Sequence, residues 1–166
     1  MAELNGIDVD QLREYVSKVA QDPARADRDP TVVARWMGND ESEVTMADGG
    51  PPVRIGGSDA PSAMRMVLMA MAACDVDLIA NRASLMGVEI DDLSVEAHGH
   101  FNVQRYLGLE SPDGPGYHRV AYTVRLKTRN ATPQQLAELR RACDEASPVG
   151  DTLQRKVHVN FDFEAS

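Results

Sequence analysis

Apolar residues crowd the middle of the chain with helical periodicity. Between residues 62 and 86 they recur on nearly every side of a predicted helix, and Gly87 follows as a C-cap. An unbroken helix of about 25 residues would be about 37 Å long at 1.5 Å per residue. Because a helix that is apolar on most sides must be covered on most sides, we expect it at the centre of the fold, against its own domain or a second chain.

Other segments alternate between apolar and polar residues, which is typical of half-buried strands. Three of them follow the central helix, over residues 93–103, 118–128 and 156–164. Two more precede it, over residues 31–37 and 42–46, and the turn sequence GNDE between them predicts a hairpin.

Two further helices are predicted from periodicity and capping. Apolar residues at helical spacing predict a first helix over residues 8–21, which an Asp-Pro pair stops. In the later helix, Thr132 is the N-cap and Gln135 completes a capping box. The polar segment 24–30 is interpreted as a linker, and the Gly- and Pro-rich segment 47–61 as a loop with at most one short edge strand.

The order of these elements predicts the fold class. A helix, two or three strands, the long helix, two strands, a helix and a strand follow one another, which favours α+β over a parallel α/β sheet. The length of 166 residues suits a single domain over residues 1–166, with the helix at 8–21 as an N-terminal addition.

Charge excludes some partners. The net charge is −9, which argues against nucleic acid or an anionic membrane, since both attract clustered Lys and Arg. The apolar run 64–74 contains Arg65 and is followed by Asp75, so it is too short and too charged to span a bilayer. The acidic N-terminal segment does not resemble a signal peptide. We therefore expect a cytoplasmic protein whose Cys74 and Cys143 are reduced at rest.

The two cysteines are the first candidates for chemistry. Cys74 lies in a run of Met and Ala, where a thiol is either a small core residue or a redox group. A redox thiol has to ionise, which calls for a nearby cation, a helix N-terminus or a hydrogen-bond network. Cys143 shares a helix face with Leu136 and Leu139, which favours a core role.

Metal and cofactor chemistry finds little support in the sequence. His98 and His100 have the H-x-H spacing of some metal sites, but a solvated strand face explains two histidines without a third ligand better. The chain contains no GxSxG, P-loop, CxxC or GxGxxG motif, which disfavours several enzyme classes. We expect neither a metal nor a cofactor.

Four segments, in the right order, resemble the OsmC/Ohr family of small thiol proteins. The central one aligns without gaps on the family motif GPNPTELLLAALAAC. The segments are ARWMG with SEVTM, APSAMRMVLMAMAAC, GVEIDDLSVEAHG and ASPVGDTLQRKVHV.

The resemblance implies both a fold and an activity. Family members are intertwined homodimers, in which antiparallel sheets wrap around two long central helices packed back to back. Well-studied members reduce organic hydroperoxides with a peroxidatic and a resolving cysteine. We therefore expect a homodimer whose small-molecule partners are a peroxide and a thiol reductant.

The residues of the family site are only partly present. Cys74 falls on the peroxidatic cysteine, Ser147 falls where the resolving cysteine should be, and Arg65 stands in place of the catalytic glutamate. Ala63 replaces a proline, and Gly38–Asp40 stand where the peroxidases have an arginine that supports the thiolate. Cys143 lies four residues, or one helical turn, before the resolving position that the resemblance assigns to Ser147, so a thiol there could also approach the site of Cys74.

Three functions remain open at this point. The first is a thiol-dependent peroxidase or oxidative-stress protein that uses Cys74 and returns to the thiol with an external reductant. The second is a non-catalytic protein that binds a small apolar or thiol-containing molecule at the dimer interface, in a pocket near Met71, Asp77 and Leu78. The third is a structural protein without pocket chemistry.

Overall fold

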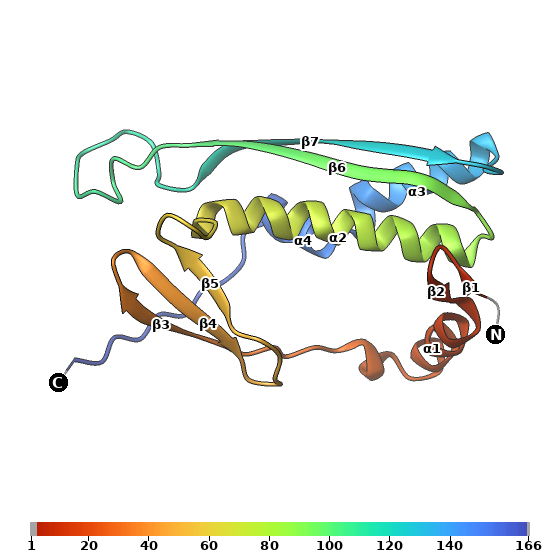
Figure 1. Cartoon of the computed structure of the whole chain (residues 1–166), viewed down its shortest axis with the longest axis horizontal. Coiled ribbons are helices and arrows are strands. Elements are labelled where there is room, and N and C mark those ends of the chain that lie inside the picture. The colour runs from red at the N-terminus through yellow and green to blue at the C-terminus, as the bar shows by residue number, and fades with distance from the viewer. Residues whose placement is uncertain (1–2, 166) are drawn as a thin grey trace.

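The computed structural model describes residues 3–165 and has the expected α+β class, with antiparallel sheets and helices in separate layers (Figure 1). Its elements are, in order, β1 (Glu3–Leu4), β2 (Ile7–Asp8), α1 (Val9–Gln21), the 3-10 helix η1 (Pro23–Ala26), β3 (Val32–Gly38), β4 (Glu41–Met46), β5 (Val53–Gly56), α2 (Ala63–Leu85), β6 (Ile90–Phe101), β7 (Tyr117–Thr128), α3 (Pro133–Ala146) and α4 (Pro148–Gln154).

Helix α2 runs through the centre, as its composition predicts. The Ser62 hydroxyl caps its first turn by accepting from the backbone N–H of Arg65. Gly87 follows the C-terminus with a φ of +71°, a conformation that glycine adopts without strain. The side chains that α2 buries most deeply on its sheet-facing side recur every four residues, at Met71, Asp75, Ile79 and Ala83.

Strands β6 and β7 form a long antiparallel hairpin over α2 (Figure 1). Its register pairs Leu93 with Leu126 and Val95 with Val124. The pattern of burial alternates along both strands, so that every second side chain faces α2, as the sequence predicts.

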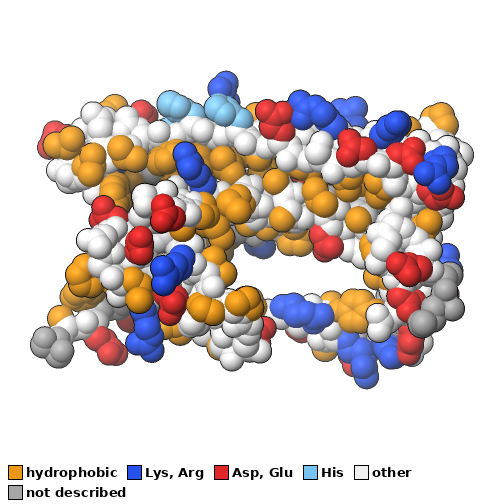
Figure 2. All heavy atoms as spheres, viewed as in Figure 1, with side chains coloured by type: hydrophobic (Ala, Val, Ile, Leu, Met, Phe, Trp, Pro, Cys, Tyr) orange, Lys and Arg blue, Asp and Glu red, His pale blue; other side chains and the backbone are white. Residues whose placement is uncertain are grey.

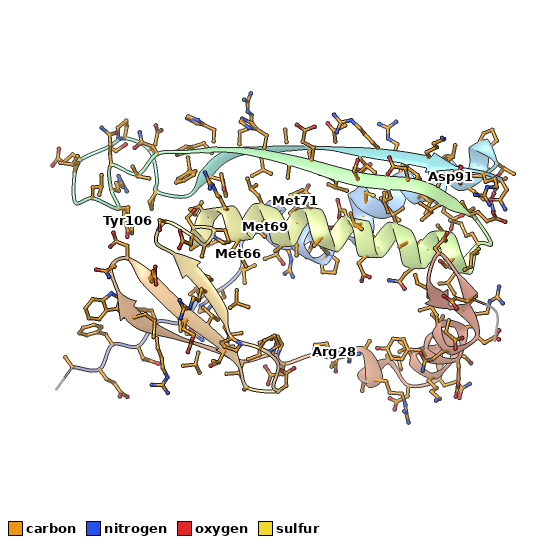
Figure 3. All side chains as sticks on the ribbon, viewed as in Figure 1. Arg28, Met66, Met69, Met71, Asp91 and Tyr106 are labelled. Carbon is orange, nitrogen blue, oxygen red and sulfur yellow. The ribbon has the colours of Figure 1, made fainter. Side chains whose placement is uncertain are left out.

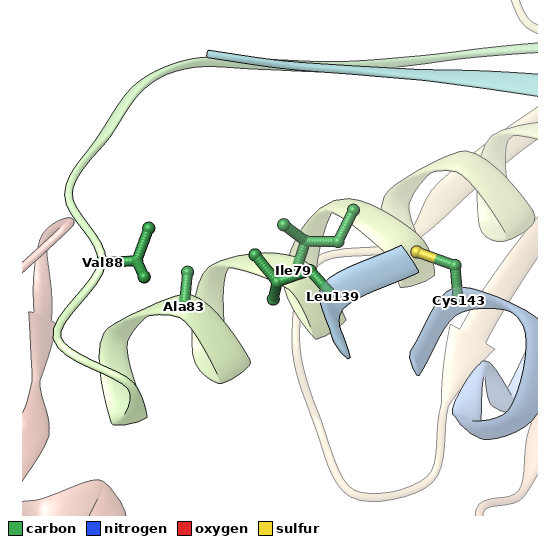
Figure 4. Packing of buried hydrophobic residues seen from close by; sticks show 5 residues of the cluster. All are labelled: Ile79, Ala83, Val88, Leu139 and Cys143. Carbon is green, nitrogen blue, oxygen red and sulfur yellow. The ribbon is translucent and has the colours of Figure 1, made fainter. Parts of the chain in front are cut away.

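Helix α3 completes the core against α2. The capping box of Thr132 and Gln135 starts the helix as predicted, and the Gln135 side-chain amide also donates to the carbonyl of Met86 at the end of α2. The cluster between the two helices and the hairpin consists of Ile79, Ala83, Val88, Leu139 and Cys143 (Figure 4).

Strands β3, β4 and β5 form a second sheet, which contains the predicted hairpin and the single short edge strand expected in the loop. This sheet is poorly covered in the single chain, because Trp36 is 80 % exposed and Val32 is 61 % exposed.

The prediction of a strand over residues 156–164 is wrong. These residues form no strand in the single chain, and the alternating side chains of Val159, Phe161 and Phe163 are about four-fifths exposed. The physical reason is the missing neighbour, since a strand needs the backbone of another strand to satisfy its N–H and C=O groups.

Four short elements were not predicted. Strands β1 and β2 have two residues each and meet at Asn5 and Gly6, which both have positive φ angles. Asn5 fastens this hairpin to the end of α2: its side chain donates to Ser84 Oγ and the Val88 carbonyl and accepts from the Ile90 N–H, at 2.9, 2.9 and 2.8 Å. The 3-10 helix η1 lies in the predicted linker, and α4 begins at Ser147 as its N-cap.

The single chain is open. Figure 2 shows a window bordered by α2, the N-terminal segment and the β3–β5 sheet. The accessible surface is 12673 Å², whereas a compact monomer of 18.1 kDa exposes about 8,000 Å². Among residues 3–165, no helix is both long enough and apolar enough to cross a membrane.

Candidate functional site around Cys74

Cys74 and Ser147 are brought together from two distant parts of the chain. Cys74 lies on α2 as a half-buried free thiol, and Ser147 lies at the junction of α3 and α4 with 2 % of its surface exposed. The Ser147 hydroxyl donates to Cys74 Sγ at 3.9 Å and accepts from the Gly150 N–H at 3.2 Å. The second bond occupies a lone pair of the hydroxyl oxygen and leaves the hydroxyl proton available for the sulfur.

Arg65 does not join this pair. It is exposed in the first turn of α2, nine residues before Cys74, which is about 13 Å along a helix axis. The segment Gly38–Asp40 forms the tip of the β3–β4 hairpin, where Asn39 and Asp40 have positive φ angles. The positions at which family peroxidases have Glu and Arg therefore supply neither an acid nor a cation beside Cys74 within this chain.

Asp75 is a fully buried carboxyl that the sequence patterns did not assign to the site. It is 0 % exposed, and neither of its oxygens has a hydrogen-bond partner among the described residues. Tyr122 on β7 lies close enough for the charge of Asp75 to help raise the pKa of its hydroxyl. The signal was present in the sequence, because Asp75 continues the four-residue spacing of Met71, Ile79 and Ala83.

Burial and the nearby carboxyls keep two groups around Asp75 protonated. Burial, followed by the charges of Asp75 and Asp144, raises the pKa of the Cys143 thiol to about 11. Burial and Asp75 raise the pKa of Tyr122 to about 12. Cys143 is 8 % exposed within the core cluster. At neutral pH it is a neutral core thiol, which is poorly suited to attack an oxidised Cys74.

Of the three residues expected to line a pocket, only Met71 borders a hollow in the structure. Met71 is buried and borders a hollow of about 600 Å³ between α2, β7 and α4. Asp77 is exposed and Leu78 is half-buried, and neither borders this hollow. Figure 3 shows Met71 directed toward the β6–β7 hairpin.

The histidines lie on the outer face of the hairpin. His98 and His100 are exposed on β6, and the ring of His100 is 6.1 Å from that of His118 on β7. Within residues 3–165, no group of three or more His, Cys, Asp or Glu side chains is arranged to hold a metal ion.

Comparison with solved structures places the fold among OsmC-like proteins. The OsmC-like protein of Mycoplasma pneumoniae is 13% identical, with a TM-score of 0.65 over 77% of this chain and 89% of that one. A protein from Psychrobacter arcticus, described as a putative osmotic stress induced and detoxification response protein, is 11% identical, with a TM-score of 0.60 over 76% and 89%. An organic hydroperoxide resistance protein OsmC from Legionella pneumophila is 15% identical, with a TM-score of 0.54 over 78% and 91%.

The sequence itself carries the family signature. A comparison with curated proteins gives no match. The family model described as OsmC-like protein matches residues 56–162, which include α2, the β6–β7 hairpin, α3 and α4. Segments β1 to β4 precede the matched part. The chain therefore belongs to the family of OsmC-like proteins.

Proposed function

We propose that the protein is a cytoplasmic, thiol-dependent reductase of organic hydroperoxides in which Cys74 reacts with the peroxide. The observation that carries this proposal is the hydrogen bond from the buried Ser147 hydroxyl to Cys74 Sγ. A hydroxyl that donates to sulfur stabilises a thiolate more than a thiol, because a bond to a charged acceptor is the stronger one. Cys74 is also partly exposed, which gives a peroxide access.

The reaction needs one cysteine and an external reductant. The Cys74 thiolate attacks one peroxide oxygen, so that an S–O bond forms, the O–O bond breaks and the alkoxide leaves as an alcohol after taking a proton. Cys74 becomes a sulfenic acid. Ser147 has no thiol with which to form a disulfide, so a small thiol attacks the sulfenic acid, releases water and leaves a mixed disulfide. A second thiol then releases reduced Cys74.

A homodimer is the assembly that suits this chain. The large accessible surface and the window in Figure 2 support this proposal, because a second copy would cover surface that a compact monomer buries. On α2, Met69 is 52 % exposed, whereas Met71, on the side of the β6–β7 hairpin, is 5 % exposed. We place the second copy against this open face of α2 and against the β3–β5 sheet.

A non-catalytic binding function is the second candidate. The hollow beside Met71 has about 600 Å³, within the range of small-molecule sites. The donor that the chain itself gives Cys74 is a neutral hydroxyl rather than a cation. In this version, Cys74 contributes to binding a small apolar or thiol-containing molecule and is not oxidised in turnover.

Turnover with matched single-cysteine variants distinguishes the two functions. We would follow the consumption of cumene hydroperoxide with a monothiol or a dithiol as reductant, using the Cys74→Ser and Cys143→Ser proteins. A reductase keeps its turnover in Cys143→Ser and loses it in Cys74→Ser. Equal, slow consumption by both variants would refute the reductase and leave the binding function.

A further inference from the structure

Histidine side chains gather on the outer face of the β6–β7 hairpin, which is turned away from α2. His98 and His100 lie on β6, His118 lies on β7, and all three are exposed. Figure 2 shows histidines next to one another along this edge of the molecule. The sequence contains the H-x-H spacing of the first two, and the structure adds a histidine from the neighbouring strand.

A bulge in β7 places His118 beside His100. Arg119 pairs with His100 and Tyr117 pairs with Phe101, so His118 is an extra residue without a partner in the ladder. The two residues of a β-bulge stand opposite one residue of the other strand. In a regular strand, either His118 or Arg119 would face α2, whereas both are exposed here. The bulge therefore presents the His118 imidazole on the same face as that of His100.

The two rings have the separation of two ligands of one metal ion. The ring centroids of His100 and His118 are 6.1 Å apart, and the ring planes are inclined by 47°. A bond of about 2.1 Å from nitrogen to zinc puts the ion about 3.2 Å from the ring centroid. Two rings on one ion are then about 5.2 Å apart at a tetrahedral angle and at most about 6.4 Å apart. The observed separation lies between these limits, and exposed side chains close the difference by small rotations.

The surroundings of the pair leave room for a cation. Ala121 stands opposite His98, so this part of the face has no large side chain on β7. Arg119 stands opposite His100 and repels a cation, but its long exposed side chain can keep the guanidinium in solvent. The net charge of −9 attracts cations to the protein as a whole.

We propose that His100 and His118 form a binding site for a divalent transition-metal ion such as Zn²⁺ or Cu²⁺, with water in the remaining coordination positions. Imidazole is a good ligand for these ions, whereas Mg²⁺ prefers oxygen. Residues 3–165 place no third protein ligand around the pair, so the bound ion is exchangeable. The site lies on the face of the hairpin away from α2, and it does not depend on the proposed chemistry of Cys74.

The first test is titration calorimetry of the full-length chain with Zn²⁺ in a buffer that does not chelate the ion. Cys74→Ser and Cys143→Ser together remove both thiols, which bind the same ions, and excess Mg²⁺ occupies carboxylates on the surface. In this background we expect one saturable site per chain. His100→Ala or His118→Ala should weaken binding at least tenfold, because each leaves a single imidazole at the site.

Three further variants serve as matched controls. His98 precedes His100 by two residues on the same face of β6, and His158 lies in the exposed C-terminal segment. His98→Ala and His158→Ala each remove an imidazole from the chain but not from the pair, so each should change the affinity by less than threefold. Arg119→Gln should tighten binding instead, because it removes a positive charge opposite His100.

Electron paramagnetic resonance of bound Cu²⁺ counts the ligands directly. In the thiol-free protein, the nitrogen splitting should show two imidazoles, and it should show one after His118→Ala. Because His118 is exposed, this variant should keep the melting temperature of the metal-free protein. The proposal is overturned if Zn²⁺ shows no saturable binding in excess Mg²⁺, or if His98→Ala and His118→Ala weaken binding equally. The histidines would then be independent, solvated side chains.

Discussion

The two sides of α2 differ in how far a single chain completes them. On the side of the β6–β7 hairpin and α3, the helix buries Ile79 and Ala83 to 1 % exposure or less in a closed core. On the other side, Met69 remains half exposed, and the β3–β5 sheet and the C-terminal segment present uncovered aromatic residues. The chain thus buries the apolar residues on one side of α2 by itself. The apolar residues on the other side stay exposed, and the proposed second copy would cover them.

The largest expected effect is on stability and concerns the side of α2 that packs against the β6–β7 hairpin and α3. Leu139 is 2 % exposed in the core cluster, so Leu139→Ala should lower the free energy of unfolding by about 2–5 kcal/mol through lost burial and a cavity. Phe163 is 79 % exposed in the single chain. Phe163→Ala should therefore leave monomer stability unchanged and weaken association instead.

Urea unfolding over a hundredfold range of protein concentration separates the two effects. The loss in Leu139→Ala should be present at every concentration, whereas the loss in Phe163→Ala should shrink as dilution dissociates both proteins into monomers of equal stability. If Phe163→Ala changes stability at no concentration, the C-terminal segment contributes nothing to an interface. The claim that a second copy covers the exposed apolar residues of this segment would then be wrong.

The next effect concerns the hydroxyl beside Cys74. Ser147→Ala removes the bond to the sulfur, and a hydrogen bond to a charged group contributes about 1.5–3 kcal/mol. The reaction of Cys74 with an organic hydroperoxide should therefore slow by about 10- to 100-fold, measured by stopped-flow at neutral pH. An unchanged rate would show that the hydroxyl does not support the thiolate.

Ser147→Cys provides the matched gain of function. Because Ser147 Oγ is 3.9 Å from Cys74 Sγ, a thiol at this position should form a disulfide with Cys74 after one equivalent of peroxide. Intact mass spectrometry would record the loss of two hydrogens relative to the reduced protein. Oxidation that stops at the sulfenic acid would contradict the close contact between these two positions.

A smaller effect is expected at the N-terminal hairpin. Asn5→Ala removes three hydrogen bonds to the end of α2 and places alanine at a φ of 55°. We expect a loss of about 1–3 kcal/mol, confined to β1, β2 and α1. Hydrogen exchange should increase there and stay unchanged in β6 and β7. Asn5→Gly keeps the backbone conformation and should recover part of the loss.

The smallest effect requires no substitution. In the native protein, alkylation of Cys143 should become half-maximal near pH 11 because burial and Asp75 raise the pKa of its thiol. In urea it should approach the ordinary value near 9. The unfolded chain loses this proton first, so the stability that the neutral thiol contributes is complete below pH 9 and is lost as the pH rises toward 11. Equal alkylation profiles in the two states would refute the shift.

The sequence predicts the parts of this fold that local chemistry determines. Periodicity and capping indicate α2, α3 and the β6–β7 hairpin, because each has apolar partners within the same chain. They also indicate the β3–β4 hairpin, because its two strands are joined by a short turn and pair with each other. The alternation over residues 156–164 predicts a strand that the single chain does not form, since periodicity shows which face seeks burial but not which chain supplies the neighbour.

The candidate site was predictable to a lesser extent. Alignment to the family motifs assigned Cys74 to the peroxidatic position and Ser147 to the resolving position. The structure brings the two side chains into contact. Arg65 lies away from them because it is more than two turns earlier on the same helix. Asp75 and Tyr122 were not predicted as neighbours, since their proximity depends on how the hairpin is registered over α2, which no single segment encodes.

The most direct test of the central claim is the fate of Cys74 itself. The Cys143→Ser protein has Cys74 as its only thiol, and we would mix it with a small excess of cumene hydroperoxide and a sulfenic-acid trapping reagent at neutral pH. Intact mass spectrometry over time gives the rate. We predict one trapped adduct per chain, formed at least a hundredfold faster than on a free cysteine and abolished in the double variant with Cys74→Ser. Modification at the rate of an ordinary thiol would contradict the proposed function.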